Sequence, residues 1–422
     1  MVITSFKTRE WMGVALVNLC IVALAGITLR YKINFSLPFV DQKFLLHAHS
    51  HFAFTGWVAL ALMALMIDYL QTAGLVTDYR KYTRLLVANC LLAYGMLISF
   101  ALQGYAAFSI AFSTLTIFVS YLFINYYWRD LNRLADPSYA PHWFRAGLVT
   151  WAVSSLGAFT LAFLMARHIR VQDYYFGAVY FFLHFQYNGW FLFACFGLLF
   201  SFLHKAGFQL SPATHKKLFG VMVITVAPTY FLSILWLKLP KSLHLIADLS
   251  AIFQLLVLIF VTRIFVVIKK RRDARLAPLT NYLWGMAFIS FVLKIILQLL
   301  SIIPFLSSYA FGFRPIVIGY LHLSFLGIIS FFILGYINQV WCGVKNGLSR
   351  TGVILFTIGV LAQEIILMMQ GLEVMELEAL PYANQWLLAA ALLMGIGLIW
   401  IAIKFNNLKK RRQHETSANF PV

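Results

Sequence analysis

The sequence predicts an all-α integral membrane protein with twelve transmembrane helices, on three observations. First, 62% of the 422 residues are hydrophobic and 11% are charged, whereas soluble domains are about 45–50% apolar and ~25% charged. Second, the apolar excess runs along the whole chain, and no hydrophilic segment approaches the ~100 residues of an ordinary soluble domain. Third, basic residues fall in short loops between the apolar segments, as the positive-inside rule describes. We therefore expect a single transmembrane domain over residues 1–422.

Each span is expected where about 20 consecutive residues are mostly apolar. The first run is interpreted as a span and not as a removable signal peptide, because no small-residue cleavage site follows it. The third and fourth spans are separated only by Gln103-Gly104-Tyr105. In chain order, the expected spans are 11–30, 44–68, 84–106, 107–128, 146–166, 175–201, 218–237, 244–268, 282–303, 315–338, 350–371 and 383–405.

The loop charges predict the orientation. Twelve spans place both termini on one side, and the main basic clusters fall on that side, which the positive-inside rule identifies as cytoplasmic. The net charge of +19 is thus explained by topology, and no nucleic-acid partner is expected. The four cysteines form no CxxC pair, so neither a disulfide framework nor a zinc site is indicated. The basic clusters lie at residues 7–9, 80–84, 129–133, 205–217, 269–275, 345–350 and 409–412, the last favouring contact with anionic membrane lipid.

Three expected spans carry a histidine that is followed five residues later by glycine. They are the second, sixth and tenth spans, so successive histidines lie four spans apart. This spacing predicts three internal repeats of four helices, over residues 11–128, 146–268 and 282–405. The three segments are HFAFTGW from His51, HFQYNGW from His184 and HLSFLGI from His322.

The predicted topology places these histidines at similar depth in the outer half of the membrane. A histidine inside a span is costly there and usually faces a bundle interior, a cavity or a cofactor. A single such histidine is also compatible with simple packing, in which it bonds to a neighbouring carbonyl. Three repeat-related ones favour a functional layer, and the glycines would let another helix or a flat ligand approach the backbone.

The second span adds two further histidines in the segment HAHSH. On a helix, His47 and His51 share a face, whereas His49 points away from them. One interpretation makes His47 or His51 an axial ligand of a cofactor and leaves His49 for the outer surface. Another takes all three histidines as an unwound copper or zinc site at the membrane edge.

With three groups of four helices and histidines near the outer ends of helices two, six and ten, the chain resembles the catalytic subunit of the heme-copper oxidases. The resemblance covers essentially the whole chain and is closest to the cbb3 oxidase and nitric oxide reductase branch. It implies a bacterial inner-membrane protein with a low-spin heme b between the second helix, through His47 or His51, and His322. It also implies that His184 lies at the position of a copper ligand.

The sequence departs from this family in ways that matter for chemistry. Tyr320 stands two residues before His322, where the family has a second histidine for a high-spin heme. The seventh span lacks the two adjacent histidines that complete the family's copper site, and the loop between the last two spans is acidic. A diverged relative, such as the NnrS-like twelve-span heme proteins, accommodates these losses better than an oxygen-reducing oxidase does.

Two ionisable residues are expected at membrane depth, Lys294 in the ninth span and Glu364 in the eleventh. Buried ionisable groups commonly mark proton or ion routes. The alternative is that Lys294 and Glu364 pair across neighbouring helices in a structural role.

The resulting functional hypothesis is a membrane heme b protein of electron transfer or of nitric oxide or oxygen-related redox chemistry, and an oxidoreductase if it is an enzyme. Because no CxxCH motif for covalent heme is present, electrons would come from quinol or from a separate donor subunit of a respiratory chain. Two alternatives stay open. One is a copper-handling or transport protein that binds metal at His49 and His184 without heme, and the other is a cofactor-free assembly subunit.

Overall fold

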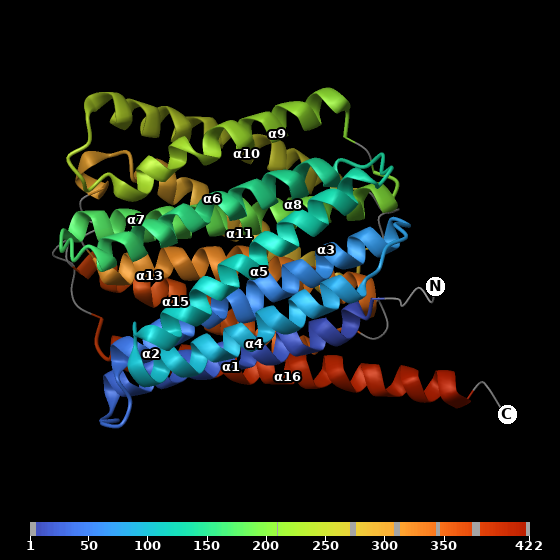
Figure 1. Cartoon of the computed structure of the whole chain (residues 1–422), viewed down its shortest axis with the longest axis horizontal. Helices are drawn as coiled ribbons and strands as arrows, with labels where there is room; N and C mark the ends of the chain where they lie inside the picture. The colour runs from blue at the N-terminus through green and yellow to red at the C-terminus, as the bar shows by residue number, and fades with distance from the viewer. Residues whose placement is uncertain are drawn as a thin grey trace.

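The computed structural model describes residues 6–208, 210–270, 276–307, 313–342, 347–373 and 380–418. These residues form helices throughout, joined by short loops (Figure 1). The helices of the first half are α1 (Thr8–Asn34), α2 (Gln42–Phe52), η1 (Ala53–Ala59), α3 (Leu60–Thr72), α4 (Arg80–Gln103), α5 (Ala107–Asn132), α6 (Ala140–Ala166), α7 (Gln172–His184), η2 (Phe185–Phe191) and α8 (Leu192–Lys205). Those of the second half are α9 (Pro212–Val226), η3 (Pro228–Ile234), α10 (Lys241–Lys270), α11 (Pro278–Leu300), α13 (Arg314–His322), η4 (Leu323–Ser330), α14 (Phe331–Ile337), η5 (Asn338–Cys342), α15 (Arg350–Leu372) and α16 (Ala383–Ala418).

Eleven continuous helical segments in the described ranges are long and apolar enough to cross a membrane. The pair α9 and η3, which is bent by 43° between Val226 and Pro228, makes a twelfth. The bend has a local cause, because proline lacks a backbone N–H and cannot continue an α-helix across its position. The predicted all-α, multi-pass architecture is confirmed, including the close boundary at which α4 ends at Gln103 and α5 begins at Ala107.

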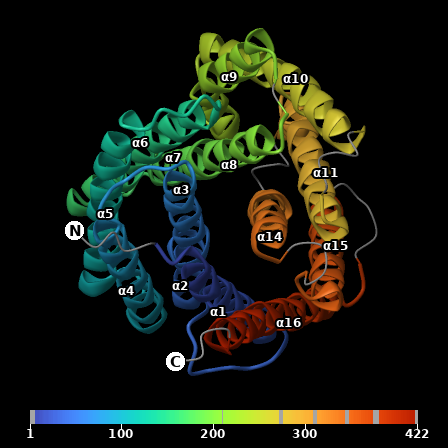
Figure 2. The ribbon, with the colours of Figure 1, turned by 90° about the vertical axis from the view of Figure 1, so that its right-hand side faces the viewer.

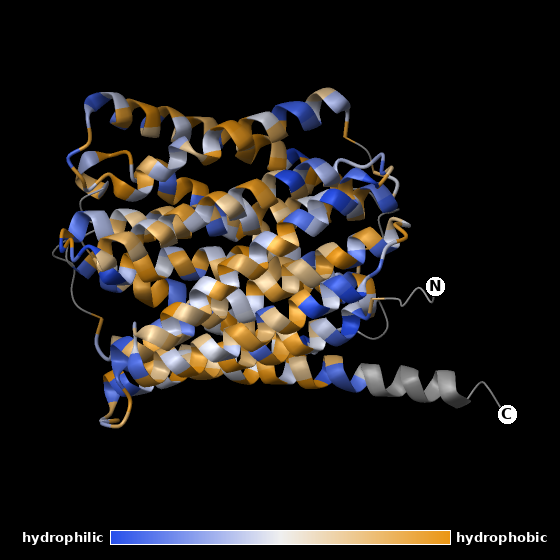
Figure 3. Ribbon diagram, viewed as in Figure 1, coloured by the Kyte–Doolittle hydropathy of each residue, from blue (hydrophilic) through white to orange (hydrophobic). Residues whose placement is uncertain are grey.

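Both termini lie at the same end of the bundle (Figure 1). We call this the terminal end and the other the distal end. Apolar residues dominate the middle of the bundle and polar residues its two ends (Figure 3), the distribution that a membrane crossing requires.

Three composite spans form the interior of the bundle. They are Gln42–Thr72, Gln172–Lys205 and Arg314–Cys342. In the most apolar 18-residue window of these spans, 78%, 83% and 61% of the residues are buried, against 22–50% in the other continuous spans. Viewed along the bundle, α3, α8 and α14 lie inside, and the other helices are arranged around them (Figure 2). The interior spans are the three that carry the histidine-glycine pattern.

Burial along each interior span is uneven. Near the terminal end it is nearly complete, with ten of the 13 residues of α3 and all seven of α14 buried. Towards the distal end it is sparse: two residues of α2, two of α7 and none of α13 are buried. The distal halves of the central helices, where the histidines lie, are therefore the loosely packed part of the interior.

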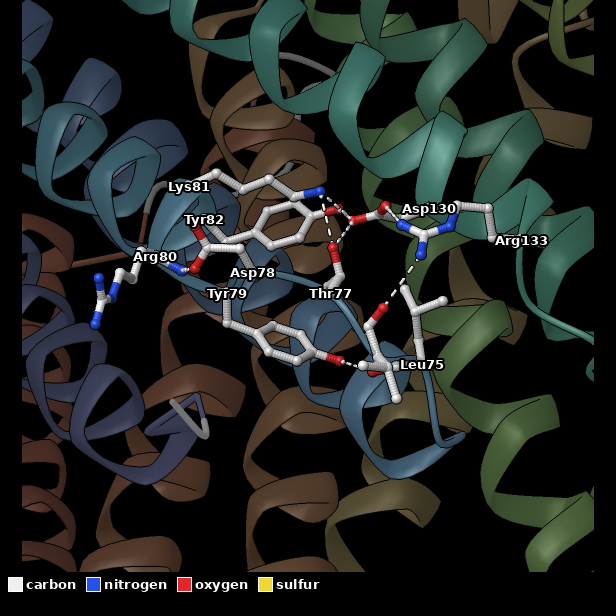
Figure 4. A network of polar contacts seen from close by, with 10 residues as sticks. Leu75, Thr77, Asp78, Tyr79, Arg80, Lys81, Tyr82, Asp130 and Arg133 are labelled. Atoms are coloured by element: carbon white, nitrogen blue, oxygen red, sulfur yellow. Dashed lines mark hydrogen bonds and ion pairs between the residues drawn. The ribbon is translucent and has the colours of Figure 1, made fainter. Parts of the chain in front are cut away.

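A polar network at the terminal end joins α4 and α5 (Figure 4). The carboxylate of Asp130 is 3% exposed and accepts hydrogen bonds from Tyr82 at 2.8 Å and Thr77 at 3.3 Å. It also pairs with Lys81 at 2.5 Å and Arg133 at 3.2 Å. A buried carboxylate is tolerable only when its oxygens are satisfied in this way, so we assign these residues a structural role.

Candidate cofactor site

The histidine-glycine pattern corresponds to a repeated backbone feature. One or two residues after the histidine, each interior span changes from α-helix to π-helix. Such π turns are rare and often occur at functional sites. The segments are η1 after His51, η2 after His184 and η4 after His322, and they contain Gly56, Gly189 and Gly327 respectively.

Two of the glycines allow a neighbouring helix to approach the π-helix, as the sequence predicts. A Cβ at Gly189 would lie 2.6 Å from Thr150 of α6, and one at Gly327 would lie 2.7 Å from the Ser290 hydroxyl of α11. At Gly56 a Cβ would instead meet the Phe52 ring of the same span at 2.7 Å. The Asn18 amide of α1 donates to the Gly56 carbonyl at 2.7 Å.

Aromatic rings fill the place where the three π-helices meet. Phe54, Tyr187 and Phe325 each follow a patterned histidine by three residues. The ring centroids of Phe54 and Phe325 are 4.4 Å apart, and those of Tyr187 and Phe325 are 6.4 Å apart. The predicted histidine layer therefore does not converge on one central point, because the histidines contact different helices around this aromatic centre.

His47 and His51 face α4, on the same side of α2 as predicted. The ring of His51 stacks on Phe100 with centroids 4.3 Å apart, and its Nε2 lies 3.2 Å from the Tyr105 hydroxyl. The ring of His47 is 4.7 Å from that of Tyr105 in an edge-on contact.

His49 points to the opposite side, towards α1. Its Nδ1 lies 3.0 Å from the Val22 carbonyl, and a Cβ at Gly26 would be 3.3 Å from its Cε1. Because a carbonyl can only accept, Nδ1 carries the proton and Nε2 presents a lone pair. The sequence interpretation that left His49 at the outer surface missed this interior contact.

His322 is anchored in the same way. Its Nδ1 lies 2.9 Å from the Ile318 carbonyl, which leaves Nε2 with a lone pair. His322 interacts electrostatically with His49, and Arg30 interacts with both histidines. The structure thus brings together His49 and His322, with Arg30 close by.

Arg30 makes the surroundings of His49 and His322 positively charged, which favours a negatively charged ligand. Arg314, at the start of α13, lies close enough to Arg30 for the two guanidinium groups to repel each other. Neither arginine forms an ion pair with a carboxylate among the described residues. Two neighbouring cations that have no carboxylate partner among the described residues, beside two histidine lone pairs, favour binding of an anionic group.

His184 is buried in a different environment. Its Nε2 donates to the Val226 carbonyl at 2.7 Å, at the bend between α9 and η3, and its Nδ1 accepts from the Asn188 amide at 3.0 Å. Both ring nitrogens are therefore used within the protein. Within the described ranges, no group of three or more histidine, cysteine or acidic side chains could hold a metal ion. These residues do not fit a copper site.

The predicted polar residues lie apart from each other. Lys294 is 4% exposed, interacts electrostatically with His184, and has a long hydrogen bond of 3.4 Å to Gln298. Glu364 lies beside α13, where a Cβ at Gly319 would be 3.6 Å from its Oε2. No ion pair joins Lys294 and Glu364 in the described part of the chain, so the predicted pairing alternative gains no support.

Tyr320, at the position where a second ligand histidine would be expected, contacts η2. Its ring centroid is 6.1 Å from that of Tyr187 in an edge-on contact. The tyrosine pair thus links the second and third interior spans.

Comparisons with known proteins add nothing to these observations. No family model matches the chain, and no curated protein is detectably similar to it.

Proposed function

We propose that this protein is a multi-pass protein of the bacterial inner membrane that holds a b-type heme between α2 and α13. The axial ligands are His49 and His322. The observation that carries this assignment is the matched anchoring of the two rings, each held through Nδ1 by a backbone carbonyl and each left with a free Nε2 lone pair. Hydrogen bonding of the second ring nitrogen is the usual means by which proteins orient a ligating histidine.

The surroundings of the pair suit a heme. Arg30 and Arg314 supply the positive charge that two propionates require, and the interior around α2 and α13 is incompletely buried, as expected where a prosthetic group would cover the helices. Gly26 lacks a side chain, which allows the His49 ring to lie against α1. His47 and His51 contribute to packing against α4 in this proposal.

A bis-histidine heme supplies reversible one-electron transfer and leaves no axial position open for a gas ligand. We therefore propose electron transfer as the primary role, within nitric oxide or oxygen-related redox chemistry of the heme-copper oxidase type. The spacing of the histidines supports that relationship. Quinol or a separate subunit is the proposed electron donor, since the sequence carries no CxxCH motif for a covalently bound heme.

The test is a reduced-minus-oxidised absorption spectrum of the purified protein after heme-replete expression. We expect the bands of a six-coordinate b heme in the wild type and about tenfold less bound heme in His49→Ala and His322→Ala. His47→Ala and His51→Ala serve as matched controls and should retain the spectrum. Size-exclusion elution at the wild-type volume shows that a variant has folded.

Two results would overturn the assignment. Loss of heme in His47→Ala or His51→Ala, with retention in His49→Ala, would move the ligand to the opposite face of α2. A folded wild type without porphyrin would exclude the heme, and stoichiometric copper in that sample would then favour the copper-handling alternative. Absence of both would favour an assembly subunit.

A further inference from the structure

A pocket that the proposed heme does not use lies between the second and third interior spans. It is bounded by α8, α10, α11 and the η4–α14 segment, which face one another on one side of the bundle (Figure 2). Its cavity volume is about 100 Å³. All but two of the lining residues are apolar or aromatic, and the two polar ones are Lys269 and Asn281.

The pocket is polar at one end only. Lys269 and Asn281 are exposed and lie near the terminal end, at the last turn of α10 and the first turn of α11. Cys195 and Phe291 are buried deeper in the bundle. Along α10, the lining from Lys269 to Val261 extends for roughly 12 Å at the rise of an α-helix. This is the shape expected for an elongated apolar group with a polar head.

The charge at the mouth identifies the kind of head group. The Lys269 ammonium lies 4.9 Å from the centroid of the Phe265 ring, which itself stacks on Phe288 of α11 with centroids 4.2 Å apart. No carboxylate pairs with Lys269 among the residues that the structure describes. A fixed cation at the entrance of an apolar pocket favours an anionic amphiphile.

We infer that this pocket binds one acyl chain of an anionic phospholipid, with the phosphate at Lys269 and the chain directed towards Phe291. The terminal end is the basic end of the protein, and basic residues near a membrane surface attract anionic lipids. A quinone carbonyl accepts a hydrogen bond from an ammonium but carries no charge to neutralise Lys269. The site is independent of the heme proposal, because it shares no residue with the His49–His322 pair.

The experiment uses Trp284, which lines the pocket. Full-length protein in detergent is titrated with phosphatidylglycerol that carries brominated acyl chains, and quenching of tryptophan fluorescence is measured. We expect a saturable component that disappears in Trp284→Phe. Lys269→Gln should weaken this component about fivefold. Lys217→Gln, the same charge change on an exposed residue at the same end outside the pocket, should leave it unchanged.

A second variant fills the pocket with a larger side chain, so that an acyl chain no longer fits. Ala287, which is 7% exposed and lines the pocket, is replaced by Phe, and the saturable component should be lost. Leu156→Phe, on the exposed face of α6, is the control for adding a phenyl ring elsewhere.

Three outcomes would overturn the inference. Equal affinity for brominated phosphatidylglycerol and phosphatidylcholine would show that the head group is not recognised. An unchanged affinity in Lys269→Gln would remove the proposed phosphate contact. Saturable quenching by a brominated quinone analogue, in place of the phospholipid, would assign the pocket to quinone.

Discussion

The histidines differ in which ring nitrogens the protein leaves available. His184 uses both, through Val226 and Asn188. His49 and His322 each use Nδ1 only. An imidazole ligates iron through an unprotonated nitrogen, so this difference separates a structural histidine from two candidate ligands, although all three lie at similar places in their helices.

The bonds of His184 predict a structural phenotype. In His184→Ala, the Asn188 amide loses its partner in a buried site, which costs ~1–3 kcal/mol, and the Val226 carbonyl keeps only its 3.2 Å bond from Thr229. We expect a lower melting temperature in detergent and an unchanged heme spectrum. His184→Gln, whose amide is able to donate to Val226, should recover part of the stability.

A changed heme spectrum in His184→Ala at wild-type stability would contradict this assignment. It would show that the histidine contacts a cofactor and does not stabilise the bend between α9 and η3.

Residue spacing explains why the sequence favoured His47 or His51 as the heme ligand and offered His49 only for a metal site, whereas our proposal takes His49 as the heme ligand. Helical periodicity correctly placed His47 and His51 on one face and His49 on the other. It could not decide which face meets a ligand, because the periodicity of one helix does not show which neighbouring helix each face packs against. The choice depends on α1 and α13, which are distant in sequence.

Among the helices, α15 and α16 show how glycine permits close packing in this bundle. A Cβ at Gly397 of α16 would lie 2.5 Å from the Gly352 carbonyl oxygen and 2.6 Å from the Phe356 nitrogen of α15. Both are backbone atoms, which cannot move aside as a flexible side chain would. Small residues at such crossings are characteristic of helix association in membranes.

This geometry predicts that Gly397→Val separates α15 from α16. Overpacking at a well-packed contact costs ~1–3 kcal/mol, and we expect a clear fall in melting temperature. The matched control is Gly285→Ala in α11, where a Cβ would meet nothing within 4 Å. Because alanine favours helix over glycine, this control should be neutral or slightly stabilising. Similar melting temperatures for both variants would show that the crossing tolerates separation.

The π-helices could not be predicted from the sequence. The repeated spacing of histidine and glycine pointed to three equivalent helices, but a π turn depends on how neighbouring helices compete for backbone carbonyls. The Gly56 carbonyl is one example, because it accepts a hydrogen bond from Asn18 on another helix. The sequence therefore identified the three equivalent helices but not the π-helical hydrogen bonds within them.

For the whole molecule, composition and span length were sufficient to predict the architecture. Membranes force every spanning segment to satisfy its own backbone, so an apolar run of about 20 residues has few alternatives to a helix. Composition and span length do not show which helices lie inside the bundle, however. That follows from the packing of α3, α8 and α14, whose partners are contributed by all three repeats.

The placement of both termini at one end predicts the topology of the protein in the membrane. The positive-inside rule counts basic residues in short loops near span ends, and the terminal end carries clusters such as Arg80 with Lys81 and Lys216 with Lys217. We expect a fluorescent protein fused after Val422 to fluoresce in the cytoplasm, and alkaline phosphatase inserted after Leu37, in the first distal loop, to be active in the periplasm. Phosphatase inserted after Asp78, in the next loop, should be inactive. The reverse pattern would place the basic end outside, and the charge distribution would then need a cause other than membrane insertion.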